Sequence, residues 1–324
     1  MREISYREAL KEALKEEMER DDKVFLIGED IADPFGGTYK VTQGLSEIFG
    51  KERVRNTPIS EAGIIGSALG TSFTGLIPVA EIMYIDFCGA AMDQIMNQVA
   101  KLRYMSGGQV SAPLVIRTQG GSGRSSAAQH AQSLEALFVH IPGLKVVMPS
   151  TPYDAKGLLK TSIRDKNPVL FIEHKLLYNE TGLVPESEYL IPLGEADIKK
   201  EGTDLTILAT SRMVGRCLQA AKRIEEKGIS VEIIDPRTLV PLDEKAILNS
   251  VEKTGRLMIV HEAVERCGFG AEIAALAADK AFDYLDAPIK RIAAKNVPVP
   301  FAPRLENYVI PSVEDIVAGA TETF

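Results

Sequence analysis

Cysteine is scarce in this sequence of 324 residues. Cys88, Cys217 and Cys267 are far apart and odd in number, which argues against a disulfide framework and favours reduced thiols. No CxxC pair occurs, so a zinc or redox site built on paired cysteines is not expected. We therefore expect a cytoplasmic protein without disulfide bonds.

Positive charge is also in short supply, with 37 Lys and Arg against 45 Asp and Glu and a net charge of -8. No clustered basic face is present, so neither a nucleic acid nor a membrane surface is expected as a partner. Residues 62–80 carry no charge, but four glycines and Pro78 divide them into a helix, a turn and a strand. Ser5 and Glu8 are spaced as a capping box, which indicates an N-terminal helix rather than a signal peptide.

Phosphate-binding motifs for nucleotides are missing as well. The sequence contains no GxxxxGK[ST], and its nearest approaches to GxGxxG, Gly121-Ser-Gly123 and Gly268-Phe-Gly270, lack the third glycine. A Rossmann dehydrogenase would need the complete fingerprint and an acidic residue about 20 positions later. We interpret Gly268-Phe-Gly270 as a tight turn that allows close backbone packing.

Short apolar runs typical of strands alternate with helical patterns along the chain. In the first half we predict strands at 24–27, 78–83, 114–118, 145–148 and 169–173, and helices at 61–72, 86–104 and 153–165. In the second half we predict strands at 205–210, 230–235, 257–261 and 289–293, and helices at 213–227, 243–253, 271–282 and 312–321. Such alternation predicts an α/β protein of two doubly wound domains with mainly parallel sheets, at 1–180 and 196–324, joined by a linker at 181–195.

One carboxylate stands at the start of an apolar, glycine-punctuated helix, in Thr57-Pro-Ile-Ser-Glu61-Ala-Gly. If Glu61 is poorly hydrated there, its pKa rises and it becomes a candidate acid for proton transfer. The alternative is structural, because Ser60 can cap the helix and an acid in the first turn suits the helix dipole. Both interpretations are open at this stage.

A second candidate site is the glycine- and serine-rich loop that follows the predicted strand at 114–118 and contains His130. Ligands bind at the carboxyl ends of strands in parallel α/β sheets, so His130 is well placed for function. A structural hydrogen bond is the alternative role for a single histidine. We assign His174 and His261, which end apolar strands, to structural roles.

Several motifs taken together resemble the β subunit of the thiamine-diphosphate-dependent E1 component of 2-oxo acid dehydrogenase complexes, with the acetoin branch closest. The resemblance covers nearly the whole chain and implies a transketolase-like fold. Its motifs are Ile27-Gly-Glu-Asp30, Gly37-Thr-Tyr-Lys-Val-Thr-Gln-Gly44-Leu, Pro58-Ile-Ser-Glu-Ala-Gly63, Asp93-Gln-Ile-Met-Asn-Gln98, Tyr104-Met-Ser-Gly-Gly108, Gln129-His-Ala-Gln-Ser133, Pro142-Gly-Leu-Lys-Val-Val-Met-Pro149 and Asp235-Pro-Arg-Thr-Leu-Val-Pro-Leu242.

The resemblance implies specific roles for four residues. Glu61 would share a proton with N1′ of the cofactor's aminopyrimidine, which promotes formation of the carbanion at the thiazolium C2. Met83 and Phe87 would line the pyrimidine pocket, although such residues at a strand end and in a first helical turn are also common in cores. His130 would face the substrate and the incoming lipoyl group.

The resemblance also implies a structural potassium ion held largely by main-chain carbonyls, in the region of Leu114, Ser162, Asp165 and Asn167. The alternative is a helix-ending turn without an ion, because Asn and the Pro that follows it favour turns.

Thiamine-diphosphate enzymes usually anchor the diphosphate and Mg²⁺ through a Gly-Asp-Gly motif, which this sequence lacks. The resemblance therefore implies an α subunit that supplies the Mg²⁺ site in an α2β2 assembly, and an E2 acyltransferase core with its lipoyl domain as a further partner. The chain reads Lys295-Asn-Val-Pro-Val-Pro-Phe301 where pyruvate and branched-chain relatives differ, so pyruvate, a branched-chain 2-oxo acid and acetoin all stay open as substrates. The alternative function is a non-catalytic scaffolding or binding subunit.

Overall fold

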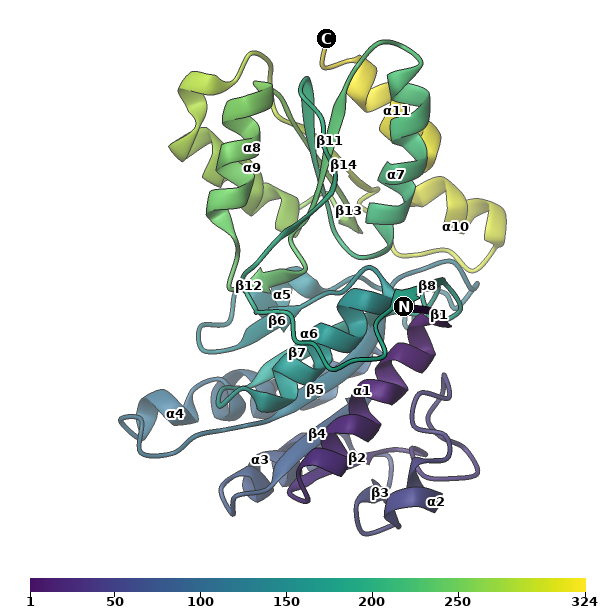
Figure 1. Cartoon of the computed structure of the whole chain (residues 1–324), viewed down its shortest axis with the longest axis vertical. Helices are drawn as coiled ribbons and strands as arrows, with labels where there is room; N and C mark the ends of the chain where they lie inside the picture. The colour runs from purple at the N-terminus through teal and green to yellow at the C-terminus, as the bar shows by residue number, and fades with distance from the viewer. The chain divides into compact units, whose positions relative to one another are not determined.

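The computed structural model describes all 324 residues, and they form two compact units (Figure 1). Unit 1 comprises residues 1–120 and 137–193, and unit 2 comprises residues 121–136 and 194–324. Segment 121–136 thus belongs to unit 2, although it lies within the first half of the sequence. None of the helices combines the length and the apolar character needed to cross a membrane.

Unit 1 is built on a parallel sheet in the order β6-β7-β5-β4-β2-β3. Its strands are β2 (Val24–Gly28), β3 (Val54–Asn56), β4 (Ile77–Ile82), β5 (Val115–Gly120), β6 (Lys145–Val147) and β7 (Val169–His174). β2, β5 and β7 are buried along their whole length, because helices cover both faces of a parallel sheet. All strands predicted for this half of the chain are confirmed.

The helices of unit 1 are α1 (Tyr6–Arg20), α2 (Leu45–Phe49), α3 (Glu61–Ser72), α4 (Leu102–Met105) and α6 (Pro152–Arg164), and α5 (Glu135–Val139) spans the boundary between the units. The single helix predicted at 86–104 is wrong. A 3-10 helix (Ile85–Ala91), a π-helix (Gln94–Val99) and α4 occupy this stretch instead. The exposed Gly89 weakens a continuous helix, because glycine is a poor helix former.

Two short strands correct the prediction of an irregular segment after residue 180. β8 (Thr181–Val184) pairs antiparallel with β1 (Arg2–Ser5). Ser5 then caps α1 in the predicted capping box with Glu8, which is confirmed. The pairing was not visible in the sequence because the partner strand is far away along the chain.

Unit 2 contains a sheet in the order β14-β13-β10-β11-β9, in which only β9 (Asp197–Lys200) runs antiparallel to its neighbour. The other strands are β10 (Leu205–Ala209), β11 (Val231–Asp235), β13 (Leu257–Val264) and β14 (Lys290–Ala294), and β12 (Thr238–Val240) lies outside this sheet. The helices are α7 (Arg212–Glu225), α8 (Glu244–Thr254), α9 (Phe269–Lys280), a 3-10 turn (Phe282–Tyr284), α10 (Pro303–Val309) and α11 (Val313–Thr321). α7 and α11 cover one face of the sheet, and α8 and α9 cover the other (Figure 1).

The glycines of Gly268-Phe-Gly270 make room for the ring of His261 at the start of α9. A Cβ atom added to Gly268 would lie 2.6 Å from His261 Cε1, and one added to Gly270 would lie 2.7 Å from His261 Cδ2. These distances agree with the interpretation of the motif as a tight turn that allows close packing, here against the His261 ring. Burial lowers the pKa of His261 to about 4, so the ring is neutral at physiological pH.

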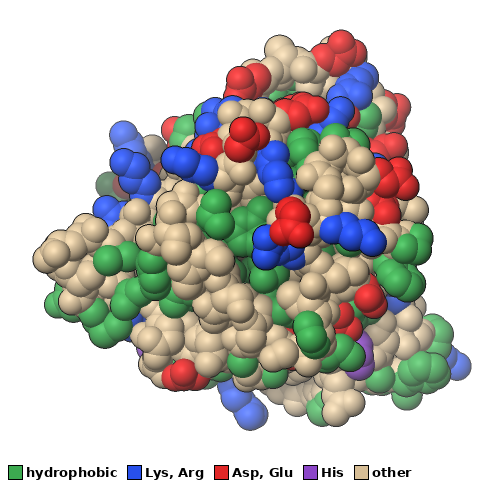
Figure 2. All heavy atoms as spheres, turned by 90° about the horizontal axis from the view of Figure 1, so that it is seen from below, with side chains coloured by type: hydrophobic (Ala, Val, Ile, Leu, Met, Phe, Trp, Pro, Cys, Tyr) green, Lys and Arg blue, Asp and Glu red, His purple; other side chains and the backbone are tan.

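The cysteines and the charged side chains of one face can be described from the structure. All three cysteines are free, with Cys88 and Cys217 buried and Cys267 exposed. Figure 2 shows one face of the molecule, on which lysine and arginine side chains are interspersed with aspartate and glutamate rather than gathered in one patch.

Candidate active site

The carboxyl ends of β3, β2 and β4 lie side by side, because these strands are parallel neighbours. In the register of the sheet, Gly28 is the partner of both Asn56 and Glu81. Each strand end is followed by candidate site residues, namely Glu29 after β2, the loop to Glu61 after β3, and the segment with Met83 and Phe87 after β4. Three predicted site residues are therefore brought to one edge of the sheet, where ligands bind in such folds.

Glu61 is the first residue of α3, and Ser60 performs the capping. The Ser60 Oγ accepts a hydrogen bond of 3.3 Å from the Gly63 N–H. The carboxylate of Glu61 forms no hydrogen bond and no ion pair within the chain. We expected this side chain to be poorly hydrated, but it is only half-buried, because the neighbouring Gly63 and Gly66 are exposed and have no side chains to cover it.

The charge of Glu61 acts on two neighbours at this edge. The pKa of Glu29 is raised, mainly by burial and further by the carboxylates of Asp30 and Glu61. Burial is also the main cause that raises the pKa of the Cys88 thiol to about 12, and the carboxylates of Asp86 and Glu61 add to the rise. Glu61 therefore lies close enough to Glu29 and Cys88 for its charge to act on both of them.

Met83 and Phe87 are both half-buried, so neither is part of the closed hydrophobic core. The Met83 carbonyl oxygen accepts a hydrogen bond of 2.6 Å from Gln119 Nε2, which fixes the end of β4 to the end of β5. Phe87 packs edge-on against Tyr84, with 5.3 Å between ring centroids and an interplanar angle of 70°. Their partial exposure leaves apolar surface at the edge that carries Glu61.

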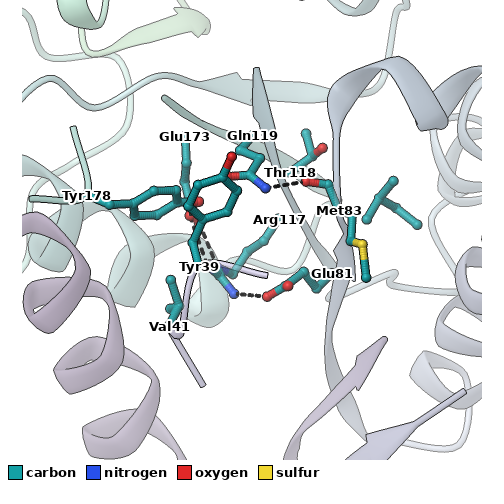
Figure 3. A pocket seen from close by; sticks show the side chains of 10 residues that line it. Tyr39, Val41, Glu81, Met83, Arg117, Thr118, Gln119, Glu173 and Tyr178 are labelled. Carbon is teal, nitrogen blue, oxygen red and sulfur yellow. Dashed lines mark hydrogen bonds and ion pairs between the residues drawn. The ribbon is translucent and has the colours of Figure 1, made fainter. Parts of the chain in front are cut away.

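A buried charged cluster centred on Arg117 lies behind this edge and was missed in the sequence. Arg117 Nε and Nη2 donate to Glu173 over 2.7 and 2.9 Å, and Nη1 donates to Glu81 over 2.8 Å. The Tyr178 hydroxyl donates to Glu173 over 2.6 Å. Figure 3 shows these side chains around a small cavity of about 10 Å³, which Met83 and Gln119 also line.

The cluster contains one positive and two negative side chains in a nearly closed space. Burial is the main cause that raises the pKa of Glu81, although Arg117 opposes the rise. Burial would lower the pKa of Arg117, but the carboxylates of Glu173 and Glu81 outweigh it and the pKa is raised. The sequence did contain a signal for this cluster, since Glu81, Arg117 and Glu173 each lie inside an apolar strand. Charged residues in buried strands need a partner.

His130 belongs to segment 121–136, which is part of unit 2. Its side chain is half-buried, in an irregular stretch between β5 and α5. The structure therefore assigns Glu61, Met83 and Phe87 to unit 1 and His130 to unit 2.

The residues suggested for a potassium ion, Leu114, Ser162, Asp165 and Asn167, lie in unit 1. The Asp165 carboxylate pairs with Lys145, and Asn167 Oδ1 accepts a hydrogen bond of 2.5 Å from Arg103 Nη1. Asp165 Oδ1 also accepts the Asn167 N–H over 2.8 Å, which is the geometry of a helix-ending turn. The side chains of Asp165 and Asn167 are thus engaged by cationic partners, and main-chain carbonyls are the ligands that the resemblance implies for the ion.

Comparison with protein-family models matches both parts of the chain. Residues 2–181 match the transketolase pyrimidine-binding domain, and residues 194–316 match the transketolase C-terminal domain. These matches agree with two parallel α/β units.

Three curated relatives are similar to this chain over almost their whole length. The chain is 52% identical to the β subunit of an acetoin:2,6-dichlorophenolindophenol oxidoreductase of Bacillus subtilis (strain 168), over 98% of this chain and 96% of the relative. It is 48% identical to a pyruvate dehydrogenase E1 β subunit of Rickettsia felis, over 97% of this chain and 96% of the relative. It is 45% identical to a 2-oxoisovalerate dehydrogenase β subunit of Bacillus subtilis (strain 168), over 98% of each chain.

Among solved structures, a split-gene transketolase described as an inactive β4 tetramer matches the fold. The TM-score is 0.81 at 23% identity, over 99% of this chain and 98% of the transketolase chain. The two family models, the identities of 45–52% and the shared fold lead to one assignment. This chain belongs to the transketolase-like family that contains the β subunits of the E1 components of 2-oxo acid and acetoin dehydrogenase complexes.

Proposed function

We propose that this chain is a catalytic E1 β subunit that provides the pyrimidine-binding half of a thiamine-diphosphate site. The observation that carries the proposal is the Glu61 carboxylate, which has no partner within the chain and stands at the carboxyl edge of the sheet. The half-buried Met83 and Phe87 offer apolar surface at the same edge. A carboxylate next to apolar side chains suits an aminopyrimidine, which has basic ring nitrogens and apolar faces.

In this proposal Glu61 holds a proton at its carboxyl oxygen and shares it with N1′ of the aminopyrimidine. Met83 and Phe87 orient the ring and exclude water from it. Thiamine diphosphate, when bound, supplies the nucleophilic carbon that attacks the substrate carbonyl.

We propose that an α subunit supplies the remaining half, including the Mg²⁺ that anchors the diphosphate, in an α2β2 assembly. The sequence contains no Gly-Asp-Gly motif for this task. Gly66 and Gly70 form an open face of α3, since a Cβ atom there would meet nothing closer than 4.0 Å. Met96 on the neighbouring π-helix is 39% exposed. This small-residue face with an adjacent exposed methionine suits a partner subunit that approaches closely.

For the substrate we propose acetoin first, with pyruvate and 2-oxoisovalerate as alternatives. Acetoin oxidoreductase subunits are among the relatives at 52% and 48% identity, and the pyruvate and 2-oxoisovalerate relatives reach 48% and 45%. The acyl or acetyl product would pass to the lipoyl group of an E2 acyltransferase, for which His130 is the candidate residue. A cytoplasmic location, which the free cysteines favour, remains a prediction.

The test is reconstitution with a candidate α subunit, thiamine diphosphate and Mg²⁺, followed by dye reduction with each of the three substrates. We expect Glu61→Gln to lower kcat at least about 100-fold, because it cannot hold a carboxyl proton. Glu226→Gln, at an exposed position at the end of α7, is the matched control and should retain full activity.

The outcomes separate catalysis from scaffolding. Equal activity of wild type and Glu61→Gln would remove Glu61 from catalysis. An assembly that forms with the α subunit but turns over none of the substrates would support the non-catalytic alternative. The substrate with the highest kcat/KM identifies the branch.

A further inference from the structure

Segment 121–136 is held to unit 2 by two buried carboxylates whose acceptor atoms face its backbone. Glu262, on β13, accepts hydrogen bonds from the Ser122 N–H over 2.6 Å and the Ser122 hydroxyl over 3.0 Å. Glu306, on α10, accepts from the Gly123 N–H over 2.6 Å and from the Ser125 N–H over 3.0 Å. Three amides of one short segment are thus bound by side chains from two distant elements.

Glu306 is unusual because it has no basic partner. Its side chain is 3% exposed, and both carboxylate oxygens are used by amides of this one segment. Burying a carboxylate is costly unless hydrogen bonds to its charged form compensate. Because both oxygens of Glu306 accept hydrogen bonds from this segment, the carboxylate in turn fixes the position of the two amides. Glu262 is 8% exposed and lies 3.8 Å from Arg212 Nη1, so its charge is partly balanced by a cation.

The backbone of the segment needs such support. Ser125 and Ala127 have positive φ angles of 53° and 60°, which residues other than glycine rarely adopt. Gly121 and Gly123 also have positive φ angles, of 83° and 105°. Ser125 and Ala127 keep this conformation only if their surroundings specify it, whereas the two glycines adopt it without strain.

The same segment carries His130, and its two ends are tied together. The Gly121 N–H donates to the Gln132 carbonyl oxygen over 3.0 Å, which closes a loop of residues 122–131. We call these residues the His130 loop. The amides bound by Glu262 and Glu306 lie inside this loop. We therefore expect a shift of residues 122–125 to displace His130 as well.

We propose that Glu306, assisted by Glu262, is a positioning residue that holds the His130 loop in its working conformation. This assignment rests on the proposed function, in which His130 acts in transfer to the lipoyl group. It gives the C-terminal unit a part in the reaction, through a carboxylate that touches neither substrate nor cofactor. Glu306→Gln is the appropriate perturbation, because the amide keeps the shape of the side chain but can accept at only one of the two N–H groups.

The experiment uses the reconstituted complex and measures two rates, dye reduction and reductive acylation of the lipoyl domain. We expect Glu306→Gln to lower kcat for lipoyl acylation about 10- to 100-fold, because misplacement of a reacting group by about 1 Å has such an effect. Dye reduction should change far less. Glu314→Gln on α11, whose side chain is 71% exposed, is the matched control and should behave as wild type.

A double-mutant cycle distinguishes positioning of His130 from a general structural effect. If Glu306 acts through His130, Glu306→Gln should cause no further loss in a His130→Ala background. Multiplicative losses would overturn the proposal. Hydrogen exchange of peptide 121–136 in the complex gives a second readout without turnover, and faster exchange is expected only in Glu306→Gln. Unchanged exchange in Glu306→Gln would also overturn this proposal. If the wild-type complex were inactive but exchange were faster in Glu306→Gln, the proposed function would be refuted, while the contact between Glu306 and the segment would be supported.

Discussion

We expect Glu135, a buried carboxylic acid, to make the stability of this protein depend on pH. Its side chain is 2% exposed, at the start of α5, and its Oε2 atom has no hydrogen-bond partner. Burial raises its pKa from the ordinary value of 4.5 to about 7, and the neighbouring Glu262 carboxylate adds to the rise. Folding therefore favours the protonated form.

The sign and size of the effect follow from the two pKa values. The contribution of Glu135 is fully favourable below pH 4.5, where the unfolded chain is also protonated, and it is lost as the pH rises to about 7. At about 1.4 kcal/mol per pH unit, the difference corresponds to about 3 kcal/mol of unfolding free energy. About 2.5 kcal/mol of this should be lost between pH 5 and pH 8.

The assay is urea unfolding of wild type and Glu135→Gln at pH 5, 6, 7 and 8. The amide cannot ionise, so the unfolding free energy of the variant minus that of wild type should rise by about 2.5 kcal/mol across this range. Glu186→Gln, at an exposed position, is the control and should give a difference that does not change with pH. A flat difference for Glu135→Gln would refute the reasoning, because it would show that Glu135 ionises alike in both states.

Two further predictions concern packing and buried charge. Gly270→Ala should lower the unfolding free energy by about 1–3 kcal/mol, because its Cβ would lie 2.7 Å from the His261 ring. The loss should nearly vanish when Gly270→Ala is made in a His261→Ala background, and an undiminished loss would contradict the contact. Arg117→Met should cost about 3–5 kcal/mol in urea unfolding, because Glu81 and Glu173 would keep buried charges without their cation. A loss below about 1 kcal/mol would show that the two carboxylates find other compensation.

Local patterns in the sequence were sufficient wherever an element is specified by its own residues. α3 begins at Glu61 and ends at Ser72, as predicted, because Ser60 caps it from within the same segment. The buried strands were found because their apolar runs are short and bounded by turn residues. The prediction of one helix at 86–104 was wrong, because the spacing of apolar residues does not show that Gly89 weakens a continuous helix.

The candidate site was only partly predictable, because local patterns do not show contacts between residues that are distant in the sequence. Met83 and Phe87 were indicated by the resemblance to a family, and the parallel neighbours β3, β2 and β4 bring them to the edge that carries Glu61, although β3 was not predicted. The potassium site remains a prediction, and the ion pair of Asp165 with Lys145 depends on a contact that the turn pattern around Asp165 does not indicate.

The sequence by itself determined two parallel α/β units, the capped helix that starts at Glu61 and the family to which the chain belongs. Only the tertiary structure showed that Arg117 joins charges from three strands and that the His130 loop is held by Glu262 and Glu306. Ser122 and Gly123 are separated from these two carboxylates by 140 and 183 positions in the chain. Periodicity and capping report interactions within a few residues, whereas buried charges are paired by the packing of distant elements.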